Sequence, residues 1–340
     1  MSDKFRIFGA EMSPYSVKVR SYFRYKGIPH EWIVRDPNTM AEYKKYARLP
    51  IIPAVATPVG EGLQDSTPII ESLEARAPEP SIHPDGGTLR FLSELIEEFA
   101  DEWGNKWMFH YRWAREADQR SAAERIAAGS MPDASAEERE KVTQYIRDRM
   151  AGRGWVIGSN EITAPLLEDS FKDGIRLLEQ HLASRSYLFG GLPSLADFGL
   201  WAQIYQAWTD PTAGAILSAG HDATCRWIDK MLDPKAEGEF ETWSSLQATL
   251  APFLEKHVRP FLLWSTANAE ALASGADEFT VELDGRSWTQ TVGGPQRYHA
   301  KSLREIRRKY GEQSPNSALR GILETAGCLE SLVRAKVAYT

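Results

Sequence analysis

The chain has 340 residues, of which 42% are hydrophobic and 26% are charged, and it contains eleven tryptophans. This length exceeds that of one ordinary domain and predicts two folded units, while the composition excludes a disordered or low-complexity chain. The net charge of -7 provides no global field that attracts polyanions, so we expect no nucleic-acid partner.

The first eighty residues alternate short β-patterned runs with helical runs, which is typical of a small α/β domain. The predicted strands cover residues 4–9, 30–35, 53–57 and 63–64, and the predicted helices cover residues 14–26, 39–47 and 66–76. This order requires a four-stranded sheet with an antiparallel hairpin at its end. We assign it to a first domain of residues 1–82.

A linker rich in proline and glycine follows at residues 77–87. Beyond it, apolar residues recur at helical spacing and predict an all-helical domain over residues 88–273. Its predicted helices cover residues 88–120, 137–150, 163–182, 194–208, 221–231 and 242–273, with an exposed loop at 127–136.

A C-terminal extension over residues 274–340 changes the pattern again. Two predicted strands, 278–283 and 287–292, flank Asp284-Gly285, a dipeptide that favours a two-residue type I′ hairpin. Helices are predicted at 295–310 and 315–334. Three roles are open for this extension: it caps the helical domain, covers a cleft or binds a partner.

The two cysteines, Cys225 and Cys328, lie about a hundred residues apart without a Cys-x-x-Cys motif or a metal-ligand spacing with histidine. We therefore expect neither a disulfide framework nor a metal site. The N-terminus lacks the pattern of a secretory signal, and no apolar run approaches the roughly 18 residues needed to cross a bilayer. We expect a cytoplasmic protein without a membrane partner.

The most informative segment begins where the first strand ends. Ser13 is placed to cap the next helix, and Pro14 occupies its first position. Plain helix capping explains both residues. The functional alternative is that a helix N-terminus stabilises an anion, and that a hydroxyl there donates a hydrogen bond to a thiolate above it.

Two later turns likewise have both a structural and a functional interpretation, and the structural one is the simpler. Ile52-Pro53 is most simply a trans proline at the entrance to a strand. Asp65-Ser66 is most simply the N-cap of the following helix.

Taken together, the three turns resemble those of the glutathione transferase superfamily, in which a thioredoxin-like domain precedes an all-helical domain. A fourth match, Ser194 with Asp197 in a Ser-x-x-Asp capping box, is similar to the box found in the family's helical domain. The resemblance covers residues 4 to about 270. It implies the glutathione transferase architecture, glutathione as co-substrate and a homodimer.

The resemblance also implies roles for individual residues. Ser13 would hydrogen-bond the sulfur of glutathione. The backbone of Ile52, before a cis Pro53, would bind the cysteinyl unit. Asp65 and Ser66 would hold the γ-glutamyl end.

The segment Ser13-Pro14-Tyr15-Ser16 looks like the Cys-Pro-Tyr-Cys motif of glutaredoxins with both sulfurs replaced by oxygen. Thiol–disulfide exchange through the protein's own cysteine is therefore excluded at this site. A free thiol with a pKa of about 8.5 is only a few per cent ionised at pH 7, and each unit of lowering corresponds to about 1.4 kcal/mol. One hydrogen bond plus the helix dipole is of that size.

One loop departs from the family pattern. Many members have Asn-Pro-x-Gly-Lys before the Val-Pro, whereas this chain has Ala47-Arg48-Leu49-Pro50-Ile51. The lysine that would meet the glycyl carboxylate of glutathione is missing, and Arg48 or Lys45 are the candidates to replace it.

The pocket for the second substrate is predicted between the domains. Trp103, Trp107 and Tyr111 form one stripe of the first helix of the second domain. Such a stripe is more often core than pocket, but its position between domains favours a partly open site for an apolar, aromatic electrophile. Tyr15 is expected to face the same cleft. His110 and Arg112, on this helix, are assigned no role.

The only local basic patch lies on the first helix of the extension, and we interpret it as a solvated helix face. Its members are Arg297, Lys301, Arg304, Arg307, Arg308 and Lys309.

The sequence therefore predicts a serine-type glutathione transferase-like enzyme. Its rival is a non-catalytic member of the fold whose cleft is vestigial and whose extension serves as a protein interface.

Overall fold

The N-terminal domain has the expected mixed sheet. The structure is a computed structural model that describes residues 4–313 and 316–334. Strand order is β2-β1-β3-β4, with β1 parallel to β2 and antiparallel to β3, and with β3 and β4 forming the antiparallel hairpin. The elements are β1 (Phe5–Gly9), α1 (Pro14–Tyr25), β2 (His30–Val34), α2 (Met40–Tyr46), β3 (Ala54–Ala56), β4 (Gly62–Gln64) and α3 (Ser66–Arg76).

Strand register brings three turns to one edge of this sheet. Phe8 of β1 pairs with Ala54 of β3, and Ala54 pairs with Gln64 of β4. The chain leaves β1 and β4 at this row and enters β3 there. The segments after β1, before β3 and after β4 therefore adjoin one another.

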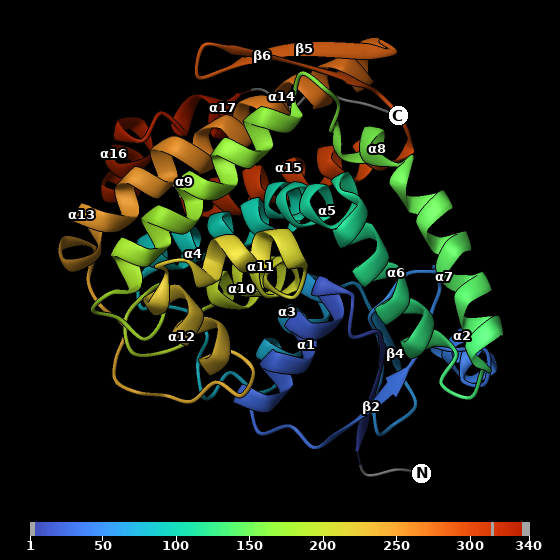
Figure 1. Ribbon diagram of the computed structural model, residues 1–340. Helices are drawn as coiled ribbons and strands as arrows, with labels where there is room; N and C mark the ends of the chain where they lie inside the picture. Colours follow the sequence, from blue (N-terminus) through green and yellow to red (C-terminus); the bar gives the residue numbers. More distant parts are fainter. Residues whose placement is uncertain (1–3, 314–315, 335–340) are drawn as a thin grey trace.

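The helical domain follows the linker and forms the middle of the molecule (Figure 1). Its elements are α4 (Gly87–Phe99), η1 (Ala100–Gly104), α5 (Asn105–Ala114), α6 (Glu116–Ser130), α7 (Ala136–Ala151), α8 (Gly154–Ile157), α9 (Ala164–Leu182), α10 (Leu195–Trp208), α11 (Pro211–Ser218), α12 (Asp222–Lys230), α13 (Trp243–Phe253), η2 (Leu254–Val258) and α14 (Arg259–Ser274). Both η segments are π-helical turns, which widen the helix by one residue.

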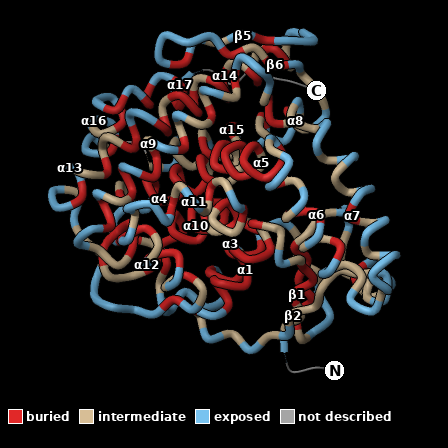
Figure 2. The backbone as a smooth tube through the Cα atoms, in the orientation of Figure 1, coloured by how far each residue is buried: buried red, intermediate tan, exposed pale blue. Residues whose placement is uncertain are grey.

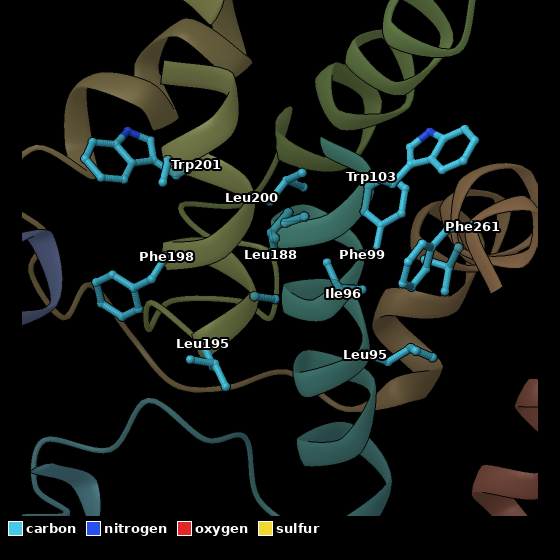
Figure 3. Close-up of a cluster of buried hydrophobic side chains, with 14 of the residues drawn as sticks. Leu95, Ile96, Phe99, Trp103, Leu188, Leu195, Phe198, Leu200, Trp201 and Phe261 are labelled. Atoms are coloured by element: carbon cyan, nitrogen blue, oxygen red, sulfur yellow. The ribbon is translucent and has the colours of Figure 1, made fainter. Parts of the chain in front are cut away.

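The core of this domain lies around α4 and α10. Figure 3 shows Ile96 and Phe99 of α4 between the side chains of α10 and Phe261 of α14. The predicted capping box is confirmed, since Ser194 Oγ accepts from the Asp197 amide and the Asp197 carboxylate accepts from the Ser194 amide. Asp197 is fully buried and also accepts from the indole of Trp227 at 2.9 Å. The box therefore joins α10 to α12.

Two predictions for the helical domain were wrong. The helix expected over residues 88–120 is interrupted at Arg115, whose backbone is extended (φ -123°, ψ 144°). The expected exposed loop at 127–136 is shorter, because α6 continues to Ser130 and Ala127 is buried. The loop was predicted from the small residues of this segment. In α6, small alanine side chains instead allow close packing against neighbouring helices, so composition alone does not indicate a loop.

The extension caps the helical domain, at the end of the molecule opposite the N-terminus (Figure 1). It contains β5 (Glu278–Leu283), β6 (Arg286–Thr291), α15 (Gly294–Glu312), α16 (Ser317–Thr325) and α17 (Leu329–Val333). Asp284 and Gly285 both have positive φ, as the predicted type I′ turn requires. The hairpin and α15 pack on α14, and α15 also packs on α4. Of the three open roles, capping is the one that this packing shows.

The final predicted helix, 315–334, is divided. Gly327 has a φ of +68° and separates α16 from α17. Its predicted start at Pro315 lies outside the described residues, as do residues 1–3 and 335–340 of the predicted first domain and extension.

Trp288 is the anchor of the hairpin. Its ring is fully buried, and its indole nitrogen donates to Gln290 Oε1 at 3.1 Å, an oxygen that Trp264 of α14 also approaches at 3.1 Å. The extension is therefore continuous with the hydrophobic core. The α6–α7 hairpin is the contrasting element, because Thr143 is the one buried residue of α7 and the rest of this helix is exposed or half-buried (Figure 2).

Within residues 4–313 and 316–334, no helix combines the length and apolar character required to span a membrane.

Candidate functional site

Ser13 lies at the N-terminus of α1, on the edge of the sheet where β1 ends. Its hydroxyl oxygen accepts a hydrogen bond from the Ser16 amide at 3.3 Å, and Pro14 occupies the first helical turn. Ser13 as a residue is half-buried. Ser16 is fully buried, and its hydroxyl has no hydrogen-bond partner among the described residues. Of the two serines in the motif, only Ser13 reaches the surface.

The turn before β3 contains a cis peptide bond between Ile52 and Pro53. Gln64, at the end of β4, fixes this turn by donating from its side-chain nitrogen to the carbonyls of Leu49 at 2.7 Å and Ile51 at 2.9 Å. The segment before the cis bond is thus held by the neighbouring strand.

Asp65 and Ser66 begin α3 on the same edge. Asp65 has a φ of 75°, an uncommon conformation for a residue with a side chain, and its carboxylate makes no capping hydrogen bond to the helix. Plain capping therefore does not explain this aspartate. Ser66 is buried, and its hydroxyl accepts from Lys18 Nζ at 3.5 Å.

Lys18 of α1 is a fully buried cation beneath this edge. Its ammonium lies 2.6 Å from the Asp101 carboxylate and also pairs with Glu97. It donates to Thr67 Oγ1 at 3.1 Å. The first-domain helices α1 and α3 are thereby joined to α4 and η1 of the helical domain. The sequence analysis missed this residue; the signal for it was the run of acids on a core-facing helix, which requires a buried cation.

Four acids on α4 and η1 face Lys18 on one side and the extension on the other: Glu97, Glu98, Asp101 and Glu102. Burial raises the pKa of Asp101 to about 7, although Lys18 opposes the shift. Burial, with repulsion from Glu102, also raises the pKa of Glu98. From α15, His299 contacts Glu102 and Ser302 contacts Glu98. The domain border is therefore a charged, closely packed seam.

Tyr15 lies at this seam. Its hydroxyl donates to the Asp101 backbone carbonyl at 2.9 Å, and the ring is half-buried. Tyr15 was expected to face the cleft along the aromatic stripe; the structure places its hydroxyl against η1 instead, and a role in binding the second substrate stays a prediction.

The predicted aromatic stripe does not line an open cleft. Trp107 is 1% exposed and Tyr111 is 0% exposed, and both pack against Phe171 of α9. The prediction of a pocket along this stripe needs correction, because the stripe faces the helical core. Trp103 is 4% exposed and borders a hollow of about 400 Å³ between α9, α14 and the β5–β6 hairpin, lined by other residues than Ser13 or Asp65.

A second apolar stripe of α5 faces the Ser13 turn instead. Phe109 and Trp113 belong to a small cluster with Ala122 and Ala123 of α6. Met12, immediately before Ser13, packs against the same cluster. The apolar surface next to Ser13 is thus made by α5 and α6.

Arg112, which was assigned no role from the sequence, is part of the same region. It is buried and donates to the carbonyl of Met12 at 2.9 Å, while Gln206 of α10 donates to the carbonyl of Glu11 at 2.6 Å. Both contacts cross from the helical domain to the turn before Ser13.

Neither cysteine is near this edge of the sheet. Cys225 lies in α12, and Cys328 follows α16. In the described part of the chain, no group of three or more His, Cys, Asp or Glu side chains is arranged to hold a metal ion. Arg48 and Lys45, the candidate replacements for the missing lysine, are both exposed.

Comparison with known proteins identifies two family domains. Residues 7–81 match the model "Glutathione S-transferase, N-terminal domain", and residues 134–230 match "Glutathione S-transferase, C-terminal domain". Together the two matches cover about half of the chain. A search of curated proteins found no match.

Several solved structures have weak similarity to this chain. A glutathione S-transferase from Methylobacterium radiotolerans in complex with glutathione sulfonate is 18% identical over 70% of this chain and 97% of its own, with a TM-score of 0.39. One from Methylobacillus flagellatus with glutathione bound is 19% identical over 67% and 95%, with a TM-score of 0.40. A GST-like protein from Pseudomonas syringae is 15% identical over 71% of both chains, with a TM-score of 0.45.

The two family models cover both domains in the expected order, and the mixed sheet followed by helices is the architecture that they describe. The chain belongs to the glutathione S-transferase superfamily.

Proposed function

We propose that this protein is a glutathione transferase-like enzyme in which Ser13 hydrogen-bonds the sulfur of glutathione and stabilises its thiolate. The observation that carries the proposal is the register of Phe8, Ala54 and Gln64, which gathers three loops at one edge of the sheet. The helix N-terminus at Ser13 favours an anion there, and the Ser13 hydroxyl supplies a donor. The thiolate then attacks an electrophilic carbon of the second substrate: a carbon–sulfur bond forms, and either the leaving group departs with its bonding electron pair or, in an addition, the π electron pair moves onto the substrate and takes up a proton.

The tripeptide would extend from Ser13 across the two neighbouring turns. The backbone of Ile52, before cis Pro53, is proposed to bind the cysteinyl unit. Asp65 and Ser66 are proposed to hold the γ-glutamyl end, which carries both an ammonium and a carboxylate. The Asp65 carboxylate makes no capping hydrogen bond, which leaves it suited to an ammonium.

We place the electrophile beside Met12, against the apolar cluster of Phe109 and Trp113. An apolar, aromatic electrophile fits such a surface because it buries its area against these side chains. Tyr15 borders this region from α1. Trp107 and Tyr111 are not part of this proposal.

Ser13→Ala tests the proposal, with Ser16→Ala as the matched control. The first removes the hydroxyl of the half-buried Ser13, and the second removes a buried hydroxyl from the same helix. A hydrogen bond to a charged group contributes about 1.5–3 kcal/mol, so Ser13→Ala is expected to raise the pKa of the bound thiol by about one to two units. The measurement is the pH dependence of thiolate absorbance and of conjugation to an aryl halide. Equal activity in both variants would contradict the proposal.

The rival function, a non-catalytic binding module, is favoured by the loop at residues 47–51, which has no lysine for the glycyl carboxylate. Titration calorimetry with glutathione separates the two. Binding supports the enzyme, and the absence of heat at millimolar ligand supports the rival. The homodimer and the cytoplasmic location stay predictions, of which the first is tested by light scattering.

A further inference from the structure

The turn that presents Ser13 is held from the other domain. Within the turn between β1 and α1, the Ser13 amide donates a hydrogen bond to the Ala10 carbonyl at 3.1 Å. The next two carbonyls, of Glu11 and Met12, accept their hydrogen bonds from Gln206 and Arg112. Each of these donors belongs to the helical domain.

Arg112 is itself fixed by three further hydrogen bonds. Its Nε donates to Asp210 Oδ2 at 2.8 Å, and its Nη2 donates to the backbone oxygen of Gln206 at 3.0 Å and to the Oε1 of Gln206 at 2.8 Å. Asp210 is 1% exposed, and its other oxygen pairs with Arg125. A planar guanidinium that is held along both edges has one orientation, so its remaining donor fixes the position of the Met12 carbonyl.

The side chain of Met12 is held by the same part of the helical domain. It packs against the cluster of Trp113, Ala122 and Ala123. Main chain and side chain of this residue are therefore both positioned by α5 and α6, and Ser13 is the next residue along the chain.

We propose that Arg112 and Gln206 are positioning residues for Ser13: they set the direction of its hydroxyl by holding the carbonyls of the turn before it. This inference rests on the proposed function for its chemical consequence, because a displaced hydroxyl no longer donates along the line to the bound sulfur. A structural role limited to domain docking would affect stability without changing the ionisation of the bound thiol.

The chain offers a matched control. Arg125 pairs with Asp210, as Arg112 does, but no contact to the Ser13 turn is among its hydrogen bonds. Arg112→Lys keeps the charge and loses the planar fork, whereas Arg125→Lys makes the same change on the other side of Asp210. Gln206→Met removes the donor to the Glu11 carbonyl at nearly constant volume and serves if Arg112→Lys fails to fold.

The first measurement is the thiol pKa of bound glutathione, obtained from thiolate absorbance at ligand saturation. We expect Arg112→Lys and Gln206→Met to raise it by about one unit, a tenfold decrease in the acid dissociation constant of the bound thiol, while affinity for S-methylglutathione changes less than about threefold. Arg125→Lys is expected to retain the native thiol pKa. A native thiol pKa in both turn variants, or an equal shift in Arg125→Lys, overturns the inference.

The second measurement does not need glutathione. Hydrogen exchange of the amides over residues 10–17 is expected to accelerate at least tenfold in Arg112→Lys and Gln206→Met, and to stay native in Arg125→Lys. Unchanged exchange in the turn variants overturns the inference even where glutathione binds. Native protein that binds no glutathione overturns the proposed function instead, and the exchange result then still decides whether the two residues hold the turn.

Discussion

The ammonium of Lys18 lies 2.6 Å from the carboxylate of Asp101, and this pair joins α1 of the first domain to η1 of the second. The Lys18 side chain is fully buried, and the Asp101 side chain is 12% exposed. Because Glu97 shares the same cation, one lysine pairs with two acids at the domain border.

Lys18→Met is therefore expected to destabilise the protein by about 3–5 kcal/mol, because it leaves buried carboxylates without their cation. Denaturant unfolding measures the change. The control is Lys141→Met, which removes an exposed partner of Glu137 and should change stability by less than about 0.5 kcal/mol. Similar losses in the two variants would contradict the importance of the buried pair.

The buried Lys106 makes the free energy of unfolding depend on pH over a defined range. Burial lowers its pKa from 10.5 to about 7, and its ammonium lies over the Trp264 ring at 3.9 Å from the centroid. Since the folded pKa is below the unfolded one, the cost of burying the charge is complete below pH 7 and is relieved as pH rises toward 10.5. Between about pH 7 and 10.5, the free energy of unfolding of the wild type should thus rise relative to that of Lys106→Met. Below pH 7 the difference between the two proteins should stay constant. Denaturant unfolding at a series of pH values tests the slope. A constant difference above pH 7 would refute the assignment.

Gly174→Ala tests the packing of the corrected aromatic stripe. A Cβ at this position of α9 would lie 2.7 Å from the Trp107 ring, which is enclosed by the core. We expect a loss of about 1–3 kcal/mol from overpacking. Gly129→Ala, in α6 with open space at its Cβ, should instead gain about 0.5–1 kcal/mol from helix propensity. If Gly174→Ala and Gly129→Ala change stability equally in thermal unfolding, the Trp107 ring is not packed against Gly174.

Trp288→Ala tests whether the extension is part of the core. Removing this buried ring is expected to cost about 3–5 kcal/mol and to expose the hairpin to proteolysis. Trp155, at 53% exposure, is the matched tryptophan, and its alanine variant should stay within about 0.5 kcal/mol of the wild type. Protease resistance of the hairpin in Trp288→Ala would show that other contacts anchor it.

Local turn chemistry explains which parts of the fold were predictable. The helix from Pro14 begins where a serine and a proline predict it, and α3 spans the predicted residues 66–76. The hairpin turns at Asp284, as its dipeptide indicates. The break at Arg115 has no glycine or proline, so the local sequence did not indicate it. Tertiary packing rather than local preference ends the helix there.

The candidate site shows the same division. Ser13, Ile52 and Asp65 could be proposed from the sequence because each belongs to a local turn motif beside the start or end of a strand. Lys18 and Arg112 were not, because their partners come from elements distant in the sequence; the run of acids on α4 and η1 indicates a buried cation but not which residue supplies it. The stripe of α5 was recognised, but sequence periodicity does not tell which neighbour a stripe faces.

The π-helical turn η1 makes the register of α5 depend on a single residue. An α-helix turns by about 100° per residue, and this turn holds one residue more than an α-turn, so regular α-helical winding of the same residues Ala100–Gly104 would rotate everything downstream by about that angle. Arg112 would swing off the Met12 carbonyl, and Trp107 would leave the core for the domain border. The one extra residue that this turn accommodates thus decides which face of α5 meets the core and which face reaches the other domain.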